Sequence, residues 1–130
     1  MGRAYTAATA ALALDTSAKW LDNTLSHNHV AGVRQEKQGI ARRLAIDGLV
    51  ILGLALRLTK DLGIPLRAAI AIAEKIASAK GQYTSPRGVS INVDLDGFQH
   101  ELLKRLDQAV EVAPLPRRGR PPKNKTGRLD

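Results

Sequence analysis

Apolar side chains recur at the three- and four-residue spacing of an α-helix in five stretches of the chain. Asp15, Thr16 and Ser17 offer capping oxygens where the second stretch begins, and Gly63 ends the third. The first two stretches are short and separated by a tight turn, which is the pattern of a helix-turn-helix. We expect helices over residues 6–12, 17–26, 46–62, 65–79 and 98–112.

Residues 27–44 have a different pattern, with isolated valines and isoleucine among polar residues and two glycines. This pattern predicts a two-stranded ribbon whose tip is the charged stretch 34–39. Because this ribbon follows a helix-turn-helix, we interpret it as the wing of a winged helix-turn-helix.

Residues 89–95 alternate apolar and polar side chains, which predicts a half-buried strand. The preceding residues 80–88 are typical of a loop, and Asp96 is placed to cap the last helix. Because an isolated strand needs a partner, we expect this strand to pair with its copy in a second subunit. Asp94 and Asp96 are then a strand end and a helix cap rather than an acid–base pair.

The composition favours a mainly α fold. Only four residues are Phe, Trp or Tyr, while 44% of the 130 residues are hydrophobic, so the core must be built from Leu, Ile, Val and Ala. The chain has no cysteine, which excludes disulfides, thiolate metal sites and cysteine nucleophiles. The longest apolar run, 49–56, is too short to span a membrane. We divide the chain into residues 1–79, a strand–helix extension at 80–112 that is a candidate for dimerisation, and a tail at 113–130.

The tail carries most of the net positive charge. It has six cations and one carboxylate, a net charge of +5 out of +8 for the chain, together with four prolines, and we expect it to be disordered when free. Its stretch RRGRPPK resembles an AT-hook, in which a Gly-Arg-Pro core enters a narrow minor groove. A generic basic tail and a proline-rich ligand remain alternatives. The residues of this minor-groove tail are Arg117, Arg118, Gly119, Arg120, Pro121 and Lys123.

Two further groups of residues are candidates for binding DNA. The second predicted helix offers Ser and Lys for phosphates and Asn for adenine, and the ribbon offers cations for flanking phosphates. The candidates on the helix are Ser17, Ala18, Lys19, Trp20 and Asn23, and those on the wing are Arg34, Lys37, Arg42 and Arg43. The alternatives are an ordinary helical hairpin and a solvated charged hairpin.

Three stretches, in this order, resemble the DNA-binding domain of the MerR-like winged helix family over residues 5–76. They are YTAATAALALDTSAKWL, ARRLAIDGLVIL and LRLTKDLGIPLRAAIAIA. The resemblance implies that residues 17–23 read the major groove and that Arg42 and Arg43 contact phosphates. The chain departs from the family at Lys19-Trp20, where an Arg-Tyr pair is usual, and at Leu44, where an aromatic residue is common. It also has a strand and a short helix in place of the family's long dimerisation helix.

We therefore expect a winged helix-turn-helix protein that binds double-stranded, AT-rich DNA as a homodimer and regulates transcription on the bacterial nucleoid, in the cytoplasm. We expect no enzymatic activity, cofactor, metal or membrane partner, and no small-molecule effector is evident from the sequence. One alternative is an architectural or recombination accessory protein. The other is an interaction module, such as an antitoxin or adaptor, in which Leu102, Leu103 and Leu106 contact a partner.

Overall fold

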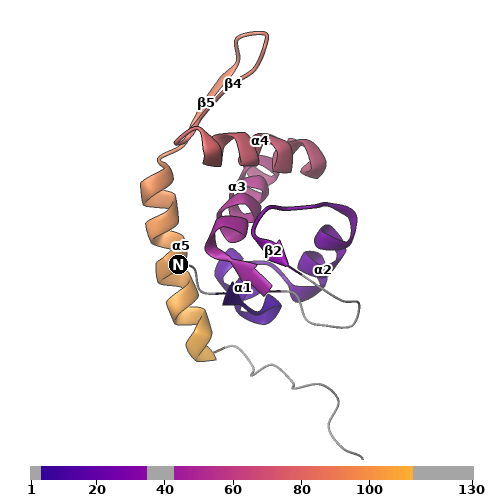
Figure 1. Ribbon diagram of the computed structural model, residues 1–130, viewed down its shortest axis with the longest axis vertical. Coiled ribbons are helices and arrows are strands. Elements are labelled where there is room, and N and C mark those ends of the chain that lie inside the picture. Colours follow the sequence, from indigo (N-terminus) through magenta and orange to yellow (C-terminus); the bar gives the residue numbers. More distant parts are fainter. Residues whose placement is uncertain (1–3, 35–42, 113–130) are drawn as a thin grey trace, which may run out of the picture.

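The computed structural model describes residues 4–34 and 43–112 (Figure 1). This part of the chain is mainly helical with two small antiparallel sheets, which confirms the predicted mainly α class. The helices are α1 (Ala7–Leu14), α2 (Ala18–His27), α3 (Ile46–Leu62), α4 (Leu66–Ser78) and α5 (Leu95–Val112). The strands are β1 (Ala4–Tyr5), β2 (Val33–Arg34), β3 (Arg43–Ala45), β4 (Gln82–Thr84) and β5 (Ser90–Asn92).

Helices α1 and α2 form a hairpin whose ends are defined by local hydrogen bonds. The Thr6 hydroxyl accepts the Thr9 N–H at 3.2 Å, and the Ser17 hydroxyl accepts the Trp20 N–H at 3.0 Å, so each helix has a side-chain N-cap. Asp15 lies between them in the left-handed region, with φ of 59°. The predicted serine cap and tight turn are therefore confirmed.

Helix α3 passes through the centre of the molecule, with α4 across one end and α5 along its side (Figure 1). It begins and ends at the predicted residues, and its residues from Gly48 to Leu56 are buried. Gly63 ends the helix at φ of 71°. The largest fully buried side chains are mostly leucines, as the composition predicted. These leucines come from α2, β3, α3 and α5: Leu21, Leu44, Leu49, Leu52 and Leu106.

The first sheet has the order β1–β3–β2, with antiparallel pairing throughout. Strands β2 and β3 are the two arms of the predicted ribbon, paired at Val33 with Leu44 and at Arg34 with Arg43. The rest of its predicted tip lies outside the described residues. Strand β1 was not predicted, because a strand of two residues is too short to show a period.

The second sheet corrects the expectation of an intersubunit strand. Strand β5 pairs with β4 of the same chain, with Tyr83 opposite Ile91, so residues 80–88 are not merely a loop. The turn at the tip of this hairpin is closed by hydrogen bonds from the Ser85 N–H to the Val89 carbonyl and from the Val89 N–H to the Ser85 hydroxyl. The predicted strand 89–95 is also too long, since Val89 is 62% exposed and α5 begins at Leu95.

Helix α5 starts three residues before the predicted 98–112, and its cap is Asp94 rather than Asp96. The Asp94 carboxylate accepts the Gly97 N–H at 3.1 Å, while Asp96 lies in the first turn. The predicted apolar stripe of α5 is only partly buried. Leu102 and Leu106 are in the core, whereas Leu103 is 40% and Val110 44% exposed.

Candidate nucleic-acid interface

Helix α2 is amphipathic, and its polar side faces outward. Leu21 and Thr24 are buried, while Lys19 and Asn23 are exposed. Lys19 and Asn23 are four residues apart, so they lie one turn apart on the same side of the helix. Ser17 and Ala18, at the N-terminus of the helix, are also exposed.

Trp20 occupies the border of this surface. It is partly buried and packs against the core. Its ring therefore helps to orient the helix from which Lys19 projects. A direct contact of Trp20 with DNA stays a prediction.

Sequence reasoning missed Asp22, an exposed carboxylate on the same polar side of α2. A carboxylate repels phosphates but accepts a hydrogen bond from the cytosine N4 amino group in the major groove. The sequence did contain a signal for Asp22. It stands between the buried Leu21 and the candidate Asn23, so on a helix it turns away from the side that Leu21 buries. A surface that combines ammonium, amide and carboxylate groups is more selective than one made only of cations.

The ribbon places two arginines in register. Arg43 of β3 is exposed, and Arg34 of β2 is directly opposite it in the backbone pairing. The other candidates lie outside the described residues: Lys37 and Arg42 of the wing, and Arg117, Arg118, Gly119, Arg120, Pro121 and Lys123 of the tail.

The base of the ribbon is tied to the first turn of α3. Gly32 has φ of 88°, and a Cβ atom built on it would lie 2.5 Å from the Gly48 backbone nitrogen. Only glycine allows this approach, which holds β2 beside the start of α3. The Ala45 N–H donates to the Gly32 carbonyl at 2.9 Å and fixes the other arm. The two arms are thus anchored to the same core that holds α2.

The described residues contain no group of three or more His, Asp or Glu side chains placed to hold a metal ion. No helix in residues 4–34 and 43–112 combines the length and apolar character needed to cross a membrane.

Comparison of the chain with protein families, curated proteins and solved structures gives no match. The resemblance to the MerR-like winged helix therefore stays a prediction.

Proposed function

We propose that the chain binds double-stranded DNA with sequence preference, with α2 in the major groove, and that it acts as a transcriptional regulator. The observation that carries this proposal is the outward face of α2, where Lys19 and Asn23 lie one turn apart while Leu21 anchors the helix in the core. An exposed helix face can enter the major groove, and an Asn side chain can bond both N6 and N7 of adenine.

The order of the elements supports a winged helix-turn-helix of the MerR-like kind. A short helix pair, α1 and α2, is followed by the ribbon of β2 and β3 and then by a second helix pair, α3 and α4. In this arrangement Arg34 and Arg43 neutralise phosphates beside the groove that α2 enters. The basic tail adds contacts in an adjacent AT-rich minor groove.

An interaction module is the less favoured alternative. Of the three leucines assigned to a partner, Leu102 and Leu106 are 4% and 0% exposed, and both belong to the core of the chain itself. Only Leu103 has substantial exposed surface. A homodimer remains part of the proposal, with two copies of α2 reading a repeated site.

The test compares two double variants with equal changes of charge. Once a genome-wide binding map has given a preferred site, fluorescence anisotropy measures the Kd for that site and for a random duplex. We expect Lys19→Ala with Asn23→Ala to lower the preference by roughly 5- to 100-fold, the range for removing one good bond to a base. The control, Lys104→Ala with Gln108→Ala, removes an exposed pair of the same spacing from α5 and leaves the preference unchanged.

A preference that survives the Lys19 and Asn23 changes would show that α2 is not the reading helix. The binding map itself separates two roles. A few defined sites support a regulator, whereas broad coverage of AT-rich DNA supports the architectural alternative.

Deletion of residues 114–130 tests the tail. The deletion removes six cations. We expect weaker binding and a flatter dependence of log Kd on log salt, because the slope falls by about 0.9 for every phosphate that the protein no longer neutralises. An unchanged slope would remove the tail from the interface.

A further inference from the structure

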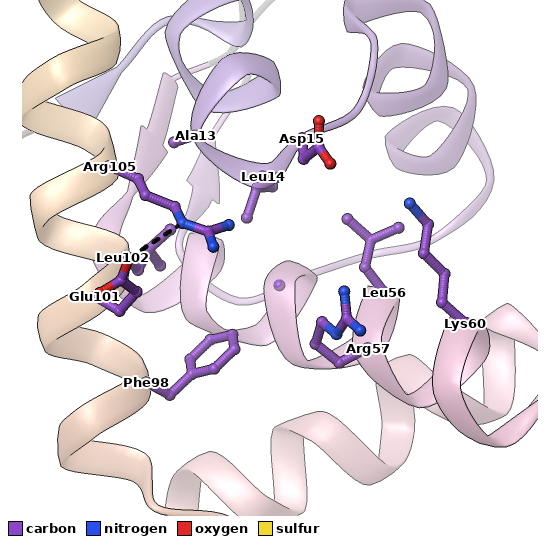
Figure 2. A pocket seen from close by; sticks show the side chains of 11 residues that line it. Ala13, Leu14, Asp15, Leu56, Arg57, Lys60, Phe98, Glu101, Leu102 and Arg105 are labelled. Atoms are coloured by element: carbon purple, nitrogen blue, oxygen red, sulfur yellow. Dashed lines mark hydrogen bonds and ion pairs between the residues drawn. The ribbon is translucent and has the colours of Figure 1, made fainter.

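A cleft of about 440 Å³ lies between α1, α3 and α5, on a part of the molecule that the DNA-binding proposal does not use (Figure 2). Its apolar lining comes from all three helices: Leu14, Leu56, Phe98 and Leu102. Sites for small ligands usually measure roughly 300–1,000 Å³ and combine apolar walls with a few polar groups. The cleft has both properties.

The apolar floor depends on a glycine in the middle of α3. A Cβ atom built on Gly53 would lie 2.9 Å from Phe98 Cζ and 3.2 Å from Leu14 Cδ2. The missing side chain lets the Phe98 ring of α5 lie directly against α3. This ring is only partly buried, so it leaves aromatic surface in the cleft.

Cations from two helices surround this floor. Arg57 and Lys60 extend from α3, and Arg105 reaches toward the cleft from α5 on the other side (Figure 2). Arg105 pairs with Glu101 at 3.4 Å, and Arg57 pairs with Asp61 on its own helix. All four side chains of these pairs are more than half exposed, so the pairs are weak and can exchange partners. Lys60 has no ion pair within the described part of the chain.

We propose that this cleft binds a small organic anion with a flat apolar body, and that its occupancy is coupled to the position of α2. The body of the ligand covers Phe98 and Leu56, and its carboxylate or similar group meets Lys60. The anion is proposed because Lys60 has no ion pair within the described residues, whereas Arg57 and Arg105 are each paired with a carboxylate, that of Asp61 and that of Glu101.

The coupling follows from the wall that α1 supplies, and it rests on the proposed DNA-binding function. Leu14 is the last residue of α1, and Asp15 is its C-cap in the left-handed conformation. Ser17, the N-cap of α2, is only two residues further along. A ligand that contacts Leu14 and Asp15 therefore contacts the turn that sets the angle between α1 and α2. By linkage, DNA must change the affinity for the ligand by the same factor as the ligand changes the affinity for DNA.

The first experiment titrates the full chain with 1-naphthaleneacetate and, as the uncharged control, 1-naphthaleneacetamide, followed by amide NMR. We expect shifts at Gly53, Phe98 and Asp15, and an affinity for the acid about fivefold higher than for the amide, the effect of one good exposed ion pair. Lys60→Gln should abolish that difference. Lys104→Gln, an equal change on α5 outside the cleft lining, should preserve it. Equal affinities for acid and amide, or shifts elsewhere, would overturn the assignment of the site.

The second experiment measures duplex affinity with and without saturating 1-naphthaleneacetate. A change of about threefold or more that disappears in Lys60→Gln supports the coupling, and an unchanged Kd overturns it. The two proposals fail separately. If the chain binds no duplex, the proposed function falls while the NMR titration still decides the ligand site. If the titration shows no binding in the cleft, the ligand site falls while duplex binding stands.

Discussion

Leu106 tests whether α5 is an integral part of the fold. Its side chain is fully buried, with 0% exposure, on a helix that packs against α1 and α3. Leu106→Ala removes three carbon atoms from this position and leaves a cavity that neighbouring helices can fill only in part. Substitutions of this kind lower the free energy of unfolding by about 2–5 kcal/mol, because apolar burial is lost and a cavity is left.

The matched substitution is Leu103→Ala on the same helix. Leu103 is 40% exposed, so it gives up less burial and leaves an open dent instead of a cavity. Because full burial of a leucine is worth about 1.5–3 kcal/mol, we expect a cost below about 1.5 kcal/mol. Urea unfolding followed by circular dichroism measures both free energies. With a slope of about 2 kcal/mol per molar urea, the middle of the usual range, Leu106→Ala should lower the midpoint by roughly 1–2.5 M.

Two results would refute this reasoning. One is an equal cost for the two substitutions, which would mean that α5 does not bury Leu106 as described. The other is a separate early transition of α5 in the unmodified chain, which would make residues 95–112 an independent unit. A single transition with an unchanged slope supports one cooperative core.

Three further substitutions examine local features of the fold by the same urea measurement. Gly32→Ala should lower the free energy of unfolding by more than about 2 kcal/mol, since it adds a Cβ atom 2.5 Å from the Gly48 nitrogen at a φ of 88°. A decrease of less than half of that would contradict the close approach of the ribbon to α3. Asp94→Ala should lower the free energy of unfolding by about 1 kcal/mol because it removes the cap of α5, and Asp96→Ala should lower it by less. The reverse order would identify Asp96 as the cap.

The features that the sequence predicted well are those determined by neighbouring residues. Helix α3 agrees with its prediction at both ends because Gly63 stops it and its apolar residues are continuous. Ser17 caps α2 through a hydroxyl only three residues from the N–H that it accepts. The exposure of Lys19 and Asn23 follows in the same way from the helical period around Leu21.

The features that were missed depend on contacts between distant residues or on competition between similar side chains. Strand β4 has only three residues, too few to show a period in the sequence, so its pairing with β5 defines it. Asp94 and Asp96 are both good capping residues, and the position at which β5 ends decides between them. The cleft could not be predicted because Leu14, Gly53 and Phe98 come from three helices, and nothing in the sequence shows which side chains lie against Gly53.

Helix α1 connects the two surfaces proposed for this protein. Its buried residues pack against α5 and α3, and its last residue contributes to the cleft before the chain turns into α2. Protein interiors are packed too densely for one helix to move without its neighbours. We therefore expect a shift of α5, whether caused by a ligand on Phe98 or by a partner bound at Leu103, to be transmitted through α1 to the helix that carries Lys19 and Asn23. This packing is the physical basis on which the proposed coupling between the cleft and α2 rests.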